Sequence, residues 1–215
     1  MIWQIIFLIT CYLWGAMSFG FFAGKIFKGI DVTEHGWRKM GGSNVARTAG
    51  VGPAIISGAL DISKGVLPVL IGNYLGWPMI GAIGGVLGVV GHNWSIFLKR
   101  GEGRGGGAGL GLAAVLAPKA FLYCFIIFII FWIITKHTPI PMILFFSCLP
   151  VAVVIFRLPY WQGWVFIGLL LVVVVKRFSG IKTEWPQVKD KWHIILNRFI
   201  FDASLQERPE EKSGL

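Results

Sequence analysis

Apolar runs of membrane-spanning length fill most of this chain, and they constrain its fold more than any other feature. A transmembrane helix needs about 20 mostly apolar residues, because the hydrocarbon core of a bilayer is about 30 Å thick. One apolar stretch, 105–135, is too long for a single span and is interrupted at Pro118–Lys119. It therefore predicts a short helix at 105–117 and a full one at 119–135. With these two, the chain has seven predicted transmembrane segments, the others being 2–26, 53–75, 77–98, 140–156 and 160–175.

The charge content leaves little room for a separate soluble domain. Only 14% of the residues are charged and 55% are hydrophobic, with a mean hydropathy of +0.72, whereas soluble proteins carry about 25% charged residues. We therefore predict an all-α, polytopic integral membrane protein whose membrane domain covers residues 1–182. The first apolar run has no charge before it and continues into Lys25, which indicates a retained span rather than a cleaved signal peptide.

The positive residues predict an orientation for the seven segments. Lysine and arginine favour the cytoplasmic side of a membrane protein. With the N-terminus outside, only Lys119 and Arg157 fall in outer loops. The cytoplasmic loops and the start of the tail then hold Lys28, Arg38, Lys39, Arg47, Lys99, Arg100, Arg104, Lys136, Lys176, Arg177 and Lys182. We therefore expect a cytoplasmic C-terminus.

The tail differs from the spans. Large apolar residues recur there at spacings of three and four, with basic residues between them: Trp185, Val188, Trp192, Ile195 and Phe199, with Lys189, Lys191 and Arg198. This pattern predicts an amphipathic helix on the membrane surface at 183–205, which could also contact a membrane-complex partner through 185–205. Residues 206–215 are expected to be disordered.

Glycine and positive charge concentrate in one polar stretch, GHNWSIFLKRGEGRGGGAGLG, which runs from Gly91 to Gly111. Glycines let backbone N–H groups approach an anion, and the positive end of a following helix adds to the attraction. Lys99, Arg100 and Arg104 supply fixed charge. The stretch predicts a phosphate site beside the bilayer, although a flexible linker has a similar composition. It is not a Walker loop, and His92 and Asn93 at its start have either a binding or a structural role.

Two other places carry polar side chains that could bind an anion. Asp61 and Lys64 are three residues apart in the second long run, so they share a helix face and can pair. Either the pair is structural, or Asp61 orients Lys64 toward an anion. In the loop MGGSNVARTAG, Asn44 can bind a hydroxyl or carbonyl and Arg47 can clamp a phosphate, unless these side chains only pack the loop.

A stripe of small residues marks the run at 77–98: Gly81, Gly84, Gly85, Gly88 and Gly91. Small residues allow helices to approach closely in a membrane, and this packing is the simpler interpretation. A groove for an acyl chain is the alternative.

Several other chemistries find no support in the sequence. The three cysteines lie in apolar runs without a C-x-x-C motif, and the four histidines do not cluster at metal-ligand spacing. No G-x-S-x-G motif occurs. The positive charge follows the membrane topology, so nucleic acid is not an expected partner. No metal and no cofactor is expected.

Five stretches together resemble the bacterial acyl-phosphate:glycerol-3-phosphate acyltransferase family, PlsY. They are, in the family's order and spacing, SFGFFAGKIFKGIDVTEHG, GGSNVARTAG, LDISKGVLPVL, GHNWSIFLK and GEGRGGGAGLG. The segment GIKTE resembles part of a final motif, so the similarity covers about residues 15–184.

The resemblance implies a seven-helix enzyme of the bacterial inner (plasma) membrane. Such an enzyme transfers an acyl group from acyl phosphate to glycerol 3-phosphate, giving lysophosphatidate for phospholipid synthesis, without acyl-CoA or a metal. By that likeness Arg47 grips a substrate phosphate, and the loop 103–109 binds glycerol 3-phosphate. The substrate-binding candidates are Asn44, Arg47, Lys64, His92, Asn93, Gly103, Arg104 and Gly105, with membrane lipids as further partners.

The chain departs from the family pattern at positions expected near the substrates. Arg104 stands where the family usually has lysine, and Ala108 where threonine is usual. Trp37, Arg38 and Lys39 replace a Ser-Gly-Asn sequence, and Arg177 and Gly180 align with a histidine and an asparagine. Two functions follow: an active acyltransferase, or a catalytically degenerate relative that serves as a subunit of a larger membrane complex.

Overall fold

The computed structural model describes residues 1–36, 38–98 and 103–179, and within these residues all regular secondary structure is helical. The predicted amphipathic helix at 183–205 and the predicted tail at 206–215 lie outside the described residues, as do Trp37 and Gly180. The described helices are α1 (Ile2–Ala16), α2 (Phe19–Lys28), α3 (Gly42–Thr48), α4 (Val51–Tyr74), α5 (Pro78–Asn93), α6 (Gly106–Leu116), α7 (Pro118–Thr135), α8 (Pro139–Ile155) and α9 (Tyr160–Phe178). The predicted all-α class is confirmed.

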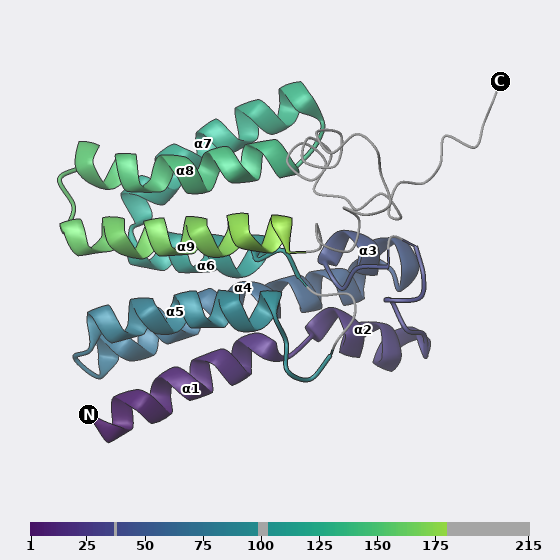
Figure 1. Ribbon diagram of the computed structural model, residues 1–215. Coiled ribbons are helices and arrows are strands. Elements are labelled where there is room, and N and C mark those ends of the chain that lie inside the picture. Colours follow the sequence, from purple (N-terminus) through teal and green to yellow (C-terminus); the bar gives the residue numbers. More distant parts are fainter. Residues whose placement is uncertain (37, 99–102, 180–215) are drawn as a thin grey trace, which may run out of the picture.

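The long helices lie side by side, with the two short helices α2 and α3 at one end of the molecule (Figure 1). In that view the beginning of α6 and the end of α9 lie at the same end as α2 and α3, away from the N-terminus. Three helices, α4, α7 and α9, are each long and apolar enough to cross a membrane, and the bent pair of α1 and α2 gives a fourth if it counts as one span.

The split predicted within 105–135 is confirmed. Helix α6 ends at Leu116, and Pro118 occupies the first position of α7. Proline suits this position because its missing N–H would have no partner in a helix anyway. Between the two helices, Ala117 adopts φ −145° and ψ 73°, outside the helical region.

Two predicted spans differ from the helices that form. The run 2–26 is not one helix, because Met17 is extended (φ −67°, ψ 125°) and the axes of α1 and α2 differ by 44°. The run 77–98 is helical only to Asn93. Ser95 explains this early end: its hydroxyl donates to the carbonyl of Ala16 (2.6 Å) and accepts the N–H of Phe97 (3.1 Å). Such a side chain competes with helix continuation.

Helix α5 packs closely against α1 and α4 and also contacts α6. The close packing predicted from its glycine stripe is confirmed. A methyl group added at Gly88 would overlap the carbonyl oxygen of Lys64 in α4, and one at Gly91 would overlap the carbonyl oxygen of Tyr12 in α1. A methyl group at Gly85 would meet Leu112 of α6. The glycines therefore let three neighbouring helices approach the backbone of α5.

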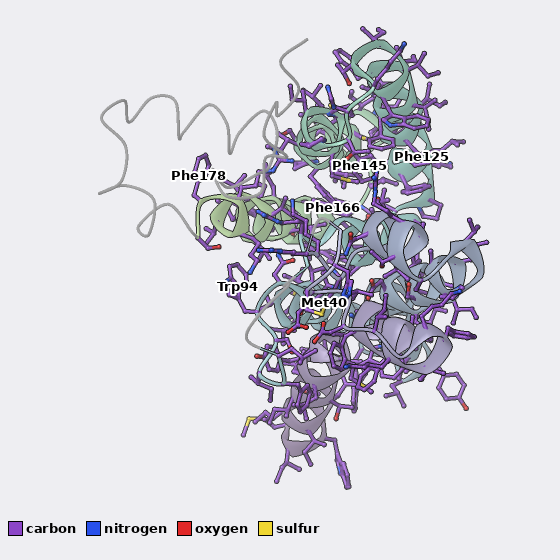
Figure 2. All side chains as sticks on the ribbon, turned by 90° about the vertical axis from the view of Figure 1, so that its right-hand side faces the viewer. Met40, Trp94, Phe125, Phe145, Phe166 and Phe178 are labelled. Carbon is purple, nitrogen blue, oxygen red and sulfur yellow. The ribbon has the colours of Figure 1, made fainter. Side chains whose placement is uncertain are left out.

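Helices α7, α8 and α9 enclose the aromatic part of the core (Figure 2). Phe145, Phe146 and Phe166 are fully buried. In contrast, α7 leaves many large apolar residues exposed, including Leu122, Ile130, Ile133 and Ile134. Exposed apolar area on this scale marks a membrane-facing surface in a chain of this composition.

Candidate active site

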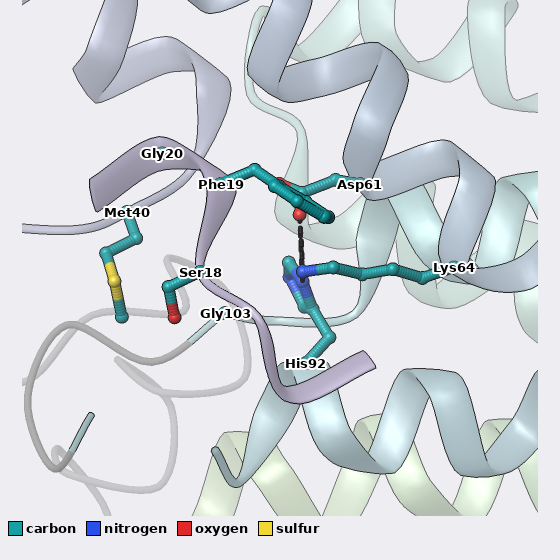
Figure 3. Close-up of a pocket in the computed structure, with 8 residues that line it drawn as sticks. All are labelled: Ser18, Phe19, Gly20, Met40, Asp61, Lys64, His92 and Gly103. Atoms are coloured by element: carbon teal, nitrogen blue, oxygen red, sulfur yellow. Dashed lines mark hydrogen bonds and ion pairs between the residues drawn. The ribbon is translucent and has the colours of Figure 1, made fainter. Parts of the chain in front are cut away.

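Three ionisable side chains meet in the interior between α4 and α5. Lys64 Nζ lies 2.6 Å from Asp61 Oδ1 and 3.1 Å from His92 Nδ1 (Figure 3). The same Asp61 oxygen lies 3.4 Å from His92 Nδ1. Lys64 is 1% exposed, and its ammonium lies 4.9 Å from the centre of the Phe19 ring. The predicted pairing of Asp61 with Lys64 is confirmed, and the structure adds His92 as a third member.

Donor and acceptor chemistry determines which nitrogen of His92 carries a proton. A lysine ammonium offers three donors and no acceptor, so His92 Nδ1 accepts the hydrogen bond from Lys64 Nζ. In a neutral imidazole beside a charged Lys64 the proton then lies on Nε2, and the 3.4 Å approach of Asp61 Oδ1 to Nδ1 is not a hydrogen bond. That nitrogen faces Gly103, where an added methyl group would overlap it. His92 therefore presents an N–H group to the segment that leads into α6.

A small pocket opens beside this cluster at the break between α1 and α2. It has room for about one water molecule. Five of its lining residues come from α2 and the loops, and four of these, all but Gly103, were not predicted as site residues because none is charged. The lining residues are Ser18, Phe19, Gly20, Met40, Asp61, Lys64, His92 and Gly103 (Figure 3).

The segment before α6 has the backbone of an anion-binding turn. Gly103 donates its N–H to the carbonyl of His92 (3.2 Å), and Gly105 has a left-handed φ of +75° as the N-cap of α6. The first N–H groups of a helix lack carbonyl partners within the helix, and the helix dipole favours negative charge at this end. The beginning of α6 can therefore hold a phosphate group.

Asn93 lies beneath this turn with its hydrogen-bonding capacity unused. The residue is 0% exposed, and neither its Oδ1 nor its Nδ2 has a hydrogen-bond partner among the described residues. A methyl group added at Gly105 would lie 3.1 Å from the oxygen and 3.3 Å from the nitrogen. A buried polar group without a partner is destabilising, and such groups concentrate at functional sites.

The loop between α2 and α3 is held together by its own polar groups. Asn44 Nδ2 lies within hydrogen-bonding distance of the carbonyl oxygens of Val32 (2.9 Å), His35 (3.1 Å) and Lys39 (2.8 Å). Hydrogen bonds from Thr33, together with weaker effects, lower the pKa of the Asp31 carboxyl. The amide nitrogen of Asn44 thus packs the loop, as the simpler interpretation of the sequence had it.

The eight predicted site residues fall into separate groups. Lys64, His92 and Gly103 line one pocket, and Asn93 touches Gly105 nearby. Arg47 is exposed in the last turn of α3, and Arg104 is half-buried just before α6. Among the described residues that line the pocket, neither arginine is present, and Asn44 is not present either.

Two further cations are buried near the end of α9. Arg177 donates a hydrogen bond to the carbonyl of Pro139 at the start of α8. Lys176 lies 5.1 Å from the centre of the Trp94 ring, just beyond α5. These two contacts join the end of α9 to α8 and to the residue that follows α5. Ala108, at a position where the family has threonine, is fully buried, and its carbonyl oxygen lies against Gly65 of α4.

Comparison with known proteins identifies the family. A family model described as glycerol-3-phosphate acyltransferase matches residues 5–183. This chain belongs to the glycerol-3-phosphate acyltransferase family. Glycerol-3-phosphate acyltransferase 5 of Dehalococcoides mccartyi is 31% identical over 218 residues, which cover 95% of this chain and 90% of that protein. The glycerol-3-phosphate acyltransferase of Shouchella clausii is 31% identical over 169 residues, covering 76% and 82%.

Solved structures of the glycerol-3-phosphate acyltransferase PlsY share this fold. The glycerol 3-phosphate form of PlsY (YgiH), an integral membrane protein, superposes with a TM-score of 0.73 at 21% identity, covering 86% of this chain and 92% of that chain. The lysophosphatidic acid form gives a TM-score of 0.72 at 20% identity with the same coverage. The likeness supports the helical membrane architecture described above.

Proposed function

We propose that this protein transfers an acyl group from acyl phosphate to glycerol 3-phosphate in a bacterial plasma membrane, giving lysophosphatidate. Membership of the glycerol-3-phosphate acyltransferase family supports the reaction. The observation that carries the proposal for this chain is the glycine-rich beginning of α6, which adjoins a buried lysine and histidine. We also propose that residues 1–182 form one membrane unit with seven crossings, an N-terminus outside and a cytoplasmic C-terminus.

The substrate-binding region of this proposal combines the polar groups around α3, α5 and α6. The backbone N–H groups at Gly105 and the next residues of α6 hold a phosphate, with charge from Arg104. Arg47 supplies a second guanidinium, which can bind phosphate oxygens bidentately. Asn44 orders the loop that carries Arg47. The residues proposed to bind the substrate, or to position the groups that bind it, are Asn44, Arg47, Lys64, His92, Asn93, Gly103, Arg104 and Gly105.

The chemistry makes modest demands on the protein. Acyl phosphate is an activated mixed anhydride, so a hydroxyl of glycerol 3-phosphate can attack its carbonyl carbon once the two are aligned. The new C–O ester bond forms, the C–O bond to phosphate breaks, and the departing phosphate takes the hydroxyl proton. Positioning and stabilisation of negative charge are the contributions that remain for the enzyme, and cationic and amide groups supply them.

A direct assay tests this function. Purified full-length protein in lipid bilayers is given acyl phosphate and glycerol 3-phosphate, and lysophosphatidate is measured. We expect product, and we expect Arg47→Ala and Arg104→Ala to lower kcat/KM strongly. Lys119→Ala is the matched control, because Lys119 is an exposed cation in the first turn of α7.

A negative result has a defined meaning. If the wild type forms no product, the proposal is wrong and the alternative of a degenerate subunit is favoured. That alternative requires a stoichiometric partner, which purification in a mild detergent would reveal. Equal activity of the two arginine variants and of Lys119→Ala would instead show that the anion site lies elsewhere.

A further inference from the structure

We infer that Asp61, Lys64 and His92 form a positioning device that sets the place of the phosphate-binding turn before α6. The inference rests on the proposed function and assigns these three residues a role within it. They act on the substrate through the backbone at Gly103.

The first step of the argument is that the Lys64 ammonium is already occupied. It pairs with Asp61 at 2.6 Å, donates to His92 Nδ1 at 3.1 Å and lies over the Phe19 ring at 4.9 Å. Its residue is 1% exposed. The adjacent pocket has room for about one water molecule, so the partners of this ammonium come from the protein itself.

The second step is that His92 connects the pair to the turn by two contacts. Its carbonyl oxygen accepts the N–H of Gly103 at 3.2 Å. Its ring packs so closely on the same glycine that an added methyl group would overlap Nε2, Cδ2 and Cε1. Because Lys64, itself held by Asp61, donates to Nδ1, the imidazole cannot rotate freely, and the position of Gly103 against it is fixed.

The third step is that the position of Gly103 against the imidazole determines the position of the proposed anion site. Only Arg104 separates Gly103 from Gly105, which has a left-handed φ of +75° and caps α6. A displacement of Gly103 is transmitted over this short connection to the N–H groups that are proposed to hold phosphate. Misplacing a bound reactant by about 1 Å can lower the rate about 100-fold.

Replacing the ion pair by apolar residues distinguishes a role in positioning the turn from a role in the stability of the fold. Exchanging both members of a buried pair for apolar residues of similar volume is often neutral or stabilising, whereas removing one member leaves an uncompensated charge. We therefore use the double variant Asp61→Leu/Lys64→Met. Ser63→Ala is the matched control, because Ser63 lies on the same turn of α4 and its hydroxyl bonds its own helix at Leu60.

In full-length protein in bilayers, we expect the double variant to keep its unfolding temperature and to lose about 10- to 100-fold in kcat/KM. The loss is expected as a higher KM for glycerol 3-phosphate, with the KM for acyl phosphate unchanged. Faster hydrogen exchange at residues 103–110, with unchanged exchange in the rest of α6, is expected as well. A folded double variant with wild-type kinetics and exchange would overturn the inference.

A second set of variants decides the matter if the double variant does not fold. Gly103→Ala places a methyl group on the imidazole, and His92→Ala removes the imidazole. If both changes act on one contact, the combination Gly103→Ala/His92→Ala raises the KM for glycerol 3-phosphate no further than the worse single change. Multiplying effects would show that the two residues act independently, against the inference.

Hydrogen exchange also distinguishes this inference from the proposed function. If the wild type forms no lysophosphatidate, the proposed function fails, while the exchange at residues 103–110 still tests whether the cluster positions the turn. If the wild type is active and these variants change neither exchange nor KM, the inference alone fails.

Discussion

Substituting Gly88 by alanine tests the packing on which the buried cluster depends. The added methyl group would overlap the carbonyl oxygen of Lys64 and lie 3.2 Å from its carbonyl carbon. Both belong to the backbone of α4, so no side-chain rotation relieves the overlap. The contact of α5 with α1 is equally close, since a methyl group at Gly15 of α1 would overlap the carbonyl of Gly88. Helix α5 therefore cannot shift away from α4 without meeting α1.

The expected loss of unfolding free energy in Gly88→Ala follows from the displacement of closely packed helices. Overpacking of this kind is destabilising by about 1–3 kcal/mol, and a radial gap of about 1 Å forfeits up to about half of each dispersion contact. Gly168→Ala in α9 is the matched control, because nothing lies within 4 Å of the methyl group that it adds. In a helix interior, glycine to alanine is favourable by about 1 kcal/mol; this gain applies to both variants and cancels, so the two differ by the overpacking cost of about 1–3 kcal/mol.

Thermal unfolding in a mild detergent, followed by circular dichroism, measures the difference. In a chain of this length, 1 kcal/mol corresponds to about 2–4 °C in Tm, so Gly88→Ala is expected to unfold roughly 2–12 °C below Gly168→Ala. The Gly88 variant should also have a higher KM for glycerol 3-phosphate, because Lys64 moves with its backbone. Equal unfolding temperatures for the two alanine variants would refute the reasoning.

Three other changes have expected outcomes. Asn93→Leu removes two unpartnered buried polar atoms, so we expect it to raise the free energy of unfolding by about 1–3 kcal/mol while raising the KM for glycerol 3-phosphate; lower stability would contradict this. Arg177→Met removes the hydrogen bond to Pro139 and should lower stability by about 1.5–3 kcal/mol, seen as a lower unfolding temperature; Arg157→Met, at an exposed arginine, is the control. The Asp31 pKa is lowered mainly by the hydrogen bond from Thr33, so this loop contact is fully present above the ordinary pKa of 3.8 and is lost as the pH falls through the lowered value. Pepsin cleavage of the loop, measured at each pH relative to Asp31→Asn to cancel the protease's own pH dependence, should therefore increase on acidification in the wild type.

Most of the helical layout could be predicted from the sequence, because apolar length and proline position act locally. The division at Pro118 is an example, since proline begins a helix readily and rarely continues one. The break at Met17 and the early end of α5 at Asn93 were not predictable in this way. Ser95 ends α5 partly by bonding to Ala16, which is distant in sequence and becomes a neighbour only after α1 and α5 pack.

The candidate site shows the same division between local and distant effects. Asp61 and Lys64 were predicted to pair because they are three positions apart on one helix. The contact of Lys64 with His92 spans 28 positions and depends on how closely α4 and α5 approach. Ser18 and Met40 carry no charge and stand only at the edges of the quoted stretches, so their chemistry gave no signal that they line the pocket.

The position of the ion pair within a single helix has a consequence for how the protein enters the membrane. An isolated charged residue at the centre of a helix opposes insertion by the translocon by about 2.5–3.5 kcal/mol. Asp61 and Lys64 lie near the middle of α4 and face each other across one turn. The helix therefore carries its own neutralising partner during biogenesis, and α4 can insert before α5 has been synthesised. His92 then joins a pair that already exists, so the order of synthesis matches the order in which the charges are satisfied.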